Sequence, residues 1–111
     1  MRDIIEMIIT FGDRDTAERI GRNVVEKRLA ACAQIEGPIK SIYWWKEELE
    51  ESEEWKCTFK TRKDLYKSLE DEIRLSHPYE LPQIVAVGID YALSGYVDWI
   101  KKETKKIEDR G

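Results

Sequence analysis

Apolar residues gather in four short segments whose patterns predict strands. Ile4 to Phe11 is a nearly continuous apolar run rich in β-branched residues, which is typical of a central strand covered on both faces. A second strand is expected over 31–46, with Gly37-Pro38 marking a bulge or bend within it. Residues 55–60 alternate between apolar and polar, and residues 84–89 are again almost wholly apolar. The pattern therefore predicts four strands.

A helical period follows the first strand after the break at Gly12-Asp13. Asp15 stands three residues before Glu18, as in a capping box, so we expect the helix to begin there. Gly21 falls among the apolar positions, and its missing side chain predicts a close approach of helix to sheet. The core face of this segment is expected to comprise Ala17, Ile20, Val24 and Leu29.

Two further helices follow from the same periodicity. Thr61 and Asp64 form a second capping box ahead of an apolar stripe. His77-Pro78 is expected to end that helix, because a residue before proline is pushed out of helical geometry. Ser94 is expected to cap a last helix. The inward residues should be Leu65, Leu69 and Ile73 in one helix and Tyr96, Trp99, Ile100 and Ile107 in the other.

The order strand-helix-strand-strand-helix-strand, followed by a helix, predicts one α+β domain over residues 1–111 with a ferredoxin-like sandwich. The acidic segment Glu47 to Glu54 is expected to be the turn of a long hairpin between the second and third strands. Right-handed crossovers would place the first two helices on one face of the sheet. The other face would be uncovered, which predicts association with another chain.

The adjacent tryptophans Trp44 and Trp45 support the same expectation. Neighbouring side chains of a strand point to opposite faces, so these two rings cannot both enter one small core. We expect one ring to face the core of its own protomer and the other to face a partner chain.

Composition narrows the classes of function. Lys+Arg (19) and Asp+Glu (23) nearly balance at a net charge of −4, which argues against nucleic-acid or general phosphate binding. No apolar run approaches the roughly 18 residues of a membrane span. The chain enters its first strand directly after Met1-Arg2-Asp3, so we expect no signal peptide and a cytoplasmic location. Cys32 and Cys57 are then expected to be reduced thiols.

His77 is the sole histidine and lies in a segment stiffened by Pro78 and Pro82. One interpretation is structural, with the ring bonded to the last helical carbonyls or stacked on Tyr79. The other makes His77 a metal ligand, with the thiolate of Cys32 or the carboxylate of Glu80 beside it. Neither Cys-x-x-Cys, His-x-x-x-His nor a calcium-loop motif supports a dedicated metal site. Cys32, between two alanines, is also typical of a small buried side chain.

Nucleophilic catalysis and phosphate binding have no matching motif. The sequence has no Gly-x-Ser-x-Gly segment and no glycine-rich loop. We therefore do not expect an enzyme.

Five blocks occur together in one order along the chain: Arg28–Ala33, Ser41–Lys46, Lys60-Thr61, His77–Pro82 and Tyr96–Ile100. In this order and spacing the sequence resembles the CutA divalent-ion-tolerance family. The resemblance implies a ferredoxin-like protomer in a cytoplasmic homotrimer, whose long hairpins pair across subunits as in the trimeric nitrogen-regulatory signal proteins. It also implies a role in tolerance of divalent metal ions, copper above all.

The chain departs from the family pattern at three places. Many members have a Lys-Gly turn after the tryptophans, whereas this chain has Lys46-Glu47. Relatives assigned to copper binding carry a cysteine and a doubled histidine where this chain has Ile9 and Ser76. Of the cysteine and two histidines found in those relatives, this chain therefore retains one histidine, His77.

Two hypotheses of function follow. In the first, a homotrimer binds divalent cations, with copper as the expected ion, through His77 with Cys32 or Glu80 nearby. In the second, a trimeric sensor or scaffold binds a small ligand or partner in clefts between subunits, lined by Tyr43, Trp44 and Tyr79.

Overall fold

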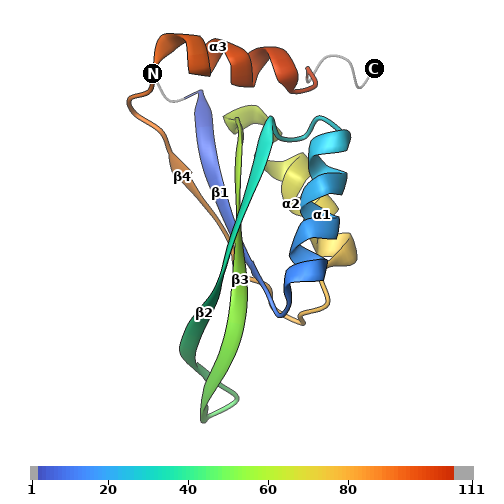
Figure 1. Ribbon diagram of the computed structural model, residues 1–111, viewed down its shortest axis with the longest axis vertical. Coiled ribbons are helices and arrows are strands. Elements are labelled where there is room, and N and C mark those ends of the chain that lie inside the picture. The colour runs from blue at the N-terminus through green and yellow to red at the C-terminus, as the bar shows by residue number, and fades with distance from the viewer. Residues whose placement is uncertain (1–2, 107–111) are drawn as a thin grey trace.

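Two helices cover one face of a four-stranded antiparallel sheet in the computed structural model, which describes residues 3–106 (Figure 1). The strand order is β2-β3-β1-β4, so the apolar strand β1 is central. This is the ferredoxin-like α+β arrangement that the sequence predicts. In chain order the elements are β1 (Ile4–Phe11), α1 (Arg14–Glu26), β2 (Cys32–Trp45), β3 (Glu48–Arg62), the 3-10 turn η1 (Lys63–Leu65), α2 (Tyr66–Ser76), β4 (Ile84–Gly88) and α3 (Ser94–Glu103).

The core lies between the sheet and the helices α1 and α2, and the helical stripes expected from the sequence point into it. Met7, Ile9 and Phe59 are fully buried on the sheet side. Gly21 permits the close approach that its position predicts, because a Cβ there would lie 3.4 Å from Cβ of Ala33. The buried helical residues are Ala17, Ile20, Val24, Leu65, Leu69 and Ile73, with Leu29 buried in the connection that follows α1.

The N-cap of α1 is Asp13, so the prediction that Asp15 opens the helix is wrong. The backbone of Asp13 is extended, and its carboxylate accepts hydrogen bonds from Thr16 N at 2.7 Å and Thr16 Oγ1 at 3.1 Å. These bonds satisfy a free amide of the first turn, whereas Asp15 already lies inside the helix. The aspartate two residues earlier therefore performs the capping.

The side-chain caps expected for the other two helices, a capping box at Thr61 and Asp64 and a cap at Ser94, are also absent from residues 3–106. Thr61 belongs to β3, where its buried hydroxyl donates to Leu29 O at 2.6 Å, and the chain enters α2 through η1 instead. Leu93 occupies the N-cap position of α3, which carries no side-chain cap, and Ser94 is the first helical residue. His77 does end α2, as predicted, with an extended backbone and its amide bonded to Ile73 O.

The β2-β3 hairpin turns at Lys46 and Glu47 alone, so the prediction of a turn over Glu47 to Glu54 is wrong. Both turn residues have positive φ, 50° and 68°, as in the tight type I′ turn of hairpins. The acidic residues that follow form β3 and pair with Ile39–Trp45. Glutamate has a weak propensity for strands, so these residues adopt strand structure because they pair with β2.

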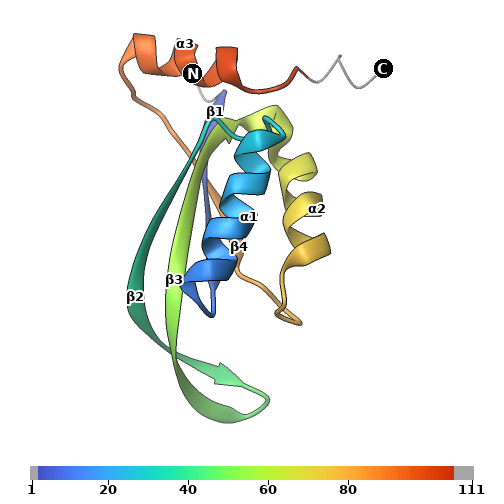
Figure 2. The same cartoon turned by 45° about the vertical axis from the view of Figure 1, so that its right-hand side comes forward.

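The bulge predicted at Gly37-Pro38 is present as a register shift between Glu36 and Ile39. Gly37 is needed there, because a Cβ would lie 2.7 Å from Cε3 of Trp55. Beyond the bulge the hairpin curves away from the rest of the sheet (Figure 2).

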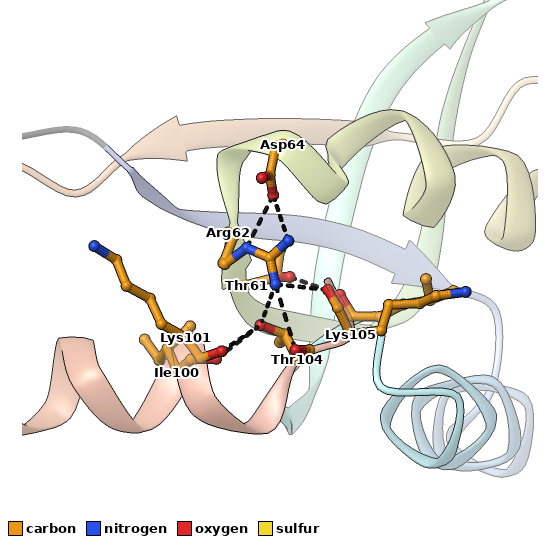
Figure 3. Close-up of polar contacts among 8 residues, drawn as sticks. Thr61, Arg62, Asp64, Ile100, Lys101, Thr104 and Lys105 are labelled. Carbon is orange, nitrogen blue, oxygen red and sulfur yellow. Dashed lines mark hydrogen bonds and ion pairs between the residues drawn. The ribbon is translucent and has the colours of Figure 1, made fainter. Parts of the chain in front are cut away.

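The guanidinium of Arg62 fastens the end of α3 to the sheet (Figure 3). Its Nη1 donates to Thr104 Oγ1 at 3.0 Å and to Lys105 O at 2.6 Å, while Nε and Nη2 contact Asp64 at 3.0 and 2.9 Å. On the other side, Arg28 Nη1 bonds Glu103 Oε1 at 3.0 Å. Segment 103–105 is therefore held by two arginines from different parts of the chain.

The apolar face expected for the last helix is confirmed only in part. Ile100 is fully buried and Tyr96 is half-buried. Trp99 is 40% exposed and stacks on Tyr96 at a centroid distance of 5.5 Å, so its expected place in the core is wrong. Ile107 lies outside the described residues.

The helices α1 and α2 lie together on one face of the sheet, as the crossover rule predicts (Figures 1 and 2). Neither tryptophan of the adjacent pair enters the buried core of the protomer: Trp44 is 72% exposed, and Trp45 is half-buried. The expectation that one ring faces this core is therefore wrong, because the hairpin carries both rings beyond it. Other large apolar side chains at the surface of the strands are Ile42, Leu49, Val85 and Val87.

Candidate functional site

His77 is buried at the junction of α2, β1 and the following loop, with both ring nitrogens engaged. Nδ1 accepts a hydrogen bond from Tyr79 N at 3.1 Å, so Nε2 carries the proton and donates to Thr10 O at 2.8 Å. The ring stacks on Phe11 at 4.6 Å and tilts against Tyr79 at 4.7 Å. The contact with Tyr79 agrees with the structural interpretation of His77, although the carbonyl it bonds belongs to β1.

The buried environment of His77 favours the neutral form of its imidazole. Burial lowers the pKa of His77 below its usual 6.5, and the hydrogen bond to Thr10 and the charge of Glu54 oppose that shift only in part. A metal ion could reach either nitrogen only by displacing a hydrogen bond that fixes the loop.

Tyr79 and Glu54 form the second half of this junction. The phenol of Tyr79 donates to Glu54 Oε2 at 2.9 Å, and Glu54 is only 8% exposed. Burial, followed by the bond to Glu54, raises the pKa of Tyr79 well above its usual value, so the phenol stays a donor. The pair connects the projecting part of the hairpin to the loop after α2.

Tyr79 and Glu54 line a hollow of about 730 Å³ between the hairpin and the loop after α2. Three consecutive aromatic residues of β2, Tyr43 to Trp45, are among its lining residues, as are Glu80 and Leu81. The three residues that the second hypothesis names, Tyr43, Trp44 and Tyr79, all line this one space. We call it the hairpin hollow.

Cys32 lies elsewhere, at the start of β2. It pairs in register with Lys60, which in turn pairs with Glu6 of β1, four residues before the Thr10 that contacts His77. Four strand residues span roughly 13 Å. The Sγ atom of Cys32 contacts the hydroxyl of Tyr96 at 3.8 Å.

Glu80 is exposed on the rim of the hairpin hollow and forms an ion pair with Lys46 at 3.7 Å. The three predicted metal ligands, His77, Cys32 and Glu80, therefore do not meet at one point of a single protomer. Across residues 3–106, no group of three or more His, Cys, Asp or Glu side chains is arranged to hold a metal ion.

Sequence reasoning missed Glu54, which it placed in a solvated turn. In the sequence, only its place directly before the apolar Trp55 sets it apart from the other glutamates of the segment.

Fold and site together describe a small ferredoxin-like protein with a projecting hairpin and a polar-aromatic hollow beside it. The family model of the CutA1 divalent ion tolerance protein matches residues 5–103. This chain belongs to that family, as the resemblance noted above implies.

Individual relatives are similar in sequence to this chain along most of its length. The divalent-cation tolerance protein CutA of Thermotoga maritima is 40% identical over 93 residues, covering 84% of this chain and 91% of the relative. That of Pyrococcus horikoshii is 35% identical over 103 residues, covering 93% and 100%. A solved structure from Archaeoglobus fulgidus, described as the periplasmic divalent cation tolerance protein CutA, superposes with a TM-score of 0.89 at 35% identity, covering 92% of this chain and 99% of that one.

Proposed function

We propose that this protein acts in divalent-cation tolerance as a homotrimer. The observation that carries the proposal is the match to the CutA1 family over residues 5–103, together with relatives named for divalent-cation tolerance. We propose a binding role rather than catalysis, because the sequence offers no nucleophile or phosphate-binding motif.

The projecting hairpin supports the trimer. The pairing of β1 with β3 ends at Phe11 and Trp55. Residues 39–54 of the β2-β3 hairpin therefore extend beyond the end of β1. Trp44 (72% exposed) and Leu49 (60%) face each other across this hairpin. A paired but unsupported hairpin with exposed large apolar side chains is stable only with further surface to bury against. The hairpins of neighbouring protomers would supply that surface.

Size-exclusion chromatography with light scattering tests the assembly. We expect about three times the 13.1 kDa of the chain. Trp44→Ala should lower this mass, whereas Leu75→Ala, at an 86% exposed position on α2, should leave it unchanged. A wild-type monomer would contradict the trimer.

Copper is the ion that we propose for this function, with His77, Cys32 and Glu80 as ligands. Since these residues lie apart within one protomer, we propose that different protomers contribute them to a shared site. Imidazole, thiolate and carboxylate are all donors that copper accepts.

Calorimetric titration with copper of the wild type and of Cys32→Ser, Glu80→Gln and His77→Gln tests these ligands, and the first two variants leave the buried His77 in place. Each variant should bind more weakly, by tenfold or more. His77→Gln should lose binding while keeping the trimer mass. Unchanged affinity and stoichiometry in all three variants would exclude the proposed ligands and leave the trimer untouched.

We also propose a cytoplasmic location, which the two free thiols, Cys32 and Cys57, support. Cell fractionation tests it, and recovery of the protein from the periplasm, as the description of the A. fulgidus relative implies for that protein, would contradict it.

The hairpin hollow supports a second candidate function, the binding of a small ligand by a trimeric sensor. Tyr43, Trp44 and Tyr79 line a common space of about 730 Å³. Ligand sites typically combine apolar walls with a few fixed polar groups, as this hollow does. A thermal-shift screen of metabolites tests the hypothesis, because a ligand of the folded protein raises its melting temperature.

A further inference from the structure

We propose that a second hollow, at the α3 end of the protein, binds a phosphate group, either as free inorganic phosphate or as the phosphate of a small ester. The proposal goes beyond divalent-cation tolerance and concerns a different part of the molecule from the hairpin hollow. We call this space the terminal hollow. It has a volume of about 680 Å³, and within residues 3–106 it is lined by Asp3, Arg62, Lys63, Asp64, Lys101 and Lys106.

Every one of these lining side chains is charged, four of them positively and two negatively. Each carboxylate already has a partner: Asp64 contacts Arg62 Nη2 at 2.9 Å, and Asp3 contacts Lys101 Nζ at 3.1 Å. Figure 3 shows Arg62 and Asp64 bonded side by side above the end of α3. The two negative charges of the lining are therefore matched by two of its positive charges.

Lys63 and Lys106 supply the positive charge that these pairs do not balance. Both side chains are exposed, and within residues 3–106 neither forms an ion pair with a carboxylate. The net charge of −4 argues against phosphate binding by the chain as a whole, but it does not describe this end, where the fold brings two such lysines to one space. The complementary ligand is an anion with about two negative charges.

A phosphate group meets this requirement better than a single carboxylate does. A phosphate monoester carries about −1.5 to −2 charges at pH 7 and presents three acceptor oxygens. Lysine binds phosphate as a point charge, so exposed lysines can adjust to it. Arg62 adds a charge whose place is already fixed, because its side chain is 12% exposed and its Nη1 donates to Thr104 and Lys105 (Figure 3).

The terminal hollow lies at the end of the molecule opposite the tip of the projecting hairpin (Figure 1). The assembly proposed above buries surface of the hairpin, residues 39–54, and none of these residues lines the terminal hollow. One protomer supplies the whole described lining. Assembly through the hairpins therefore leaves the terminal hollow open, with one phosphate site in each protomer.

Titration of the full-length protein with inorganic phosphate and with glycerol 3-phosphate, followed by NMR, tests the proposal. Glycerol is the uncharged control, and sodium chloride keeps the ionic strength constant, because salt screens interactions between exposed charges. We expect saturable shifts at the amides of residues 62–64 and 104–106 with the phosphates and none with glycerol. The phosphate that binds more tightly identifies the source of the group, free or esterified.

Variants that change one charge at an exposed position sharpen the test. Lys63→Gln and Lys106→Gln should each weaken phosphate binding by about fivefold. Asp3→Asn removes a negative charge from the lining and should strengthen binding instead. Lys102→Gln is the matched control, because Lys102 is an exposed lysine of α3 outside the described lining, and it should bind as the wild type does. Circular dichroism of each variant verifies the fold.

Three outcomes would overturn the proposal. The first is a wild type that shows no saturable response to either phosphate. The second is unchanged affinity in both Lys63→Gln and Lys106→Gln. The third is an equal loss of affinity in Lys102→Gln, since the effect would then come from the overall charge of the protein. The copper titration and the measurement of trimer mass concern other residues, so they stand or fall independently of these outcomes.

Discussion

The body of the sheet and the projecting hairpin are parts of the same two strands with opposite surroundings. In the body, β3 lies between β1 and β2, and its residues Cys57 and Phe59 are fully buried under α1 and α2. In the projecting hairpin, residues 39–54, the strands have only each other, and Trp44 and Leu49 are exposed. One end of β3 therefore contributes to the core of the protomer, and the other end presents a surface to other molecules.

Truncating a core residue in the body should give the largest loss of stability. Phe59→Ala removes a fully buried ring and leaves a cavity, so we expect a loss of about 3–5 kcal/mol in the free energy of unfolding. Urea unfolding measures it. Thr58→Ala, at the half-buried neighbouring position of β3, is the control and should cost far less. Similar losses in the two variants would contradict the division of β3 into a core-facing and an open side.

The clamp at Arg62 should give the next largest effect. Arg62→Ala leaves the carbonyls of Thr104 and Lys105 and the carboxylate of Asp64 without their shared donor, at a cost of about 1–3 kcal/mol. Amide hydrogen exchange should accelerate in α3 but not in the projecting hairpin. Arg74→Ala, at an exposed arginine of α2, is the control, and equal exchange in both variants would exclude the clamp.

Stability should also depend on the protonation of His77, at the junction of the two regions. Because the folded protein lowers the pKa of His77, the unfolded chain binds the proton more readily. The stabilising contribution is therefore present above the usual value of 6.5 and is lost as the pH falls below it. The loss is less than about 1.4 kcal/mol per pH unit for one group.

The difference in unfolding free energy between wild type and His77→Gln, measured from pH 8 to pH 5, isolates this contribution. The advantage of the wild type should shrink as the solution becomes more acidic. An advantage that grows toward pH 5 would reverse the assigned sign.

The smallest effect is expected at the tip of the hairpin. Glu47 has φ of 68°, a region that costs a side chain energy but suits glycine. Glu47→Gly should therefore stabilise the protein by about 0.4–1 kcal/mol, measured by thermal unfolding. Glu48→Gly, one residue later and within β3, should destabilise it instead. Stabilisation by both substitutions would indicate that the gain comes from lost charge and not from the turn.

The body could be predicted from the sequence far better than the hairpin. The bounds of β1 and the inward residues of α1 and α2 follow from apolar periodicity, because each of these elements packs one continuous side against the core. The glutamates from Glu48 to Glu53 form a strand only because β2 pairs with them, and that pairing has no local signal.

The candidate site divides in the same way. The aromatic residues Tyr43, Trp44 and Tyr79 could be assigned to one cleft because they are large aromatic side chains in two of the blocks that resemble the family, Ser41–Lys46 and His77–Pro82. Glu54 could not, since its burial depends on a contact with Tyr79 across 25 positions of the chain. His77, Cys32 and Glu80 were grouped by donor chemistry, and chemistry alone contains no information about distance.

The two arginines that fasten segment 103–105 have a practical consequence for experiments on this protein. Asp3, which immediately precedes β1, forms an ion pair with Lys101 at 3.1 Å and lines one hollow with Lys106. The first and last described residues therefore lie at the α3 end, opposite the hairpin tip (Figure 1). A fluorophore or surface tether attached near Asp3 or Lys106 leaves the hairpin hollow open, so the protein can be immobilised with that hollow facing solution.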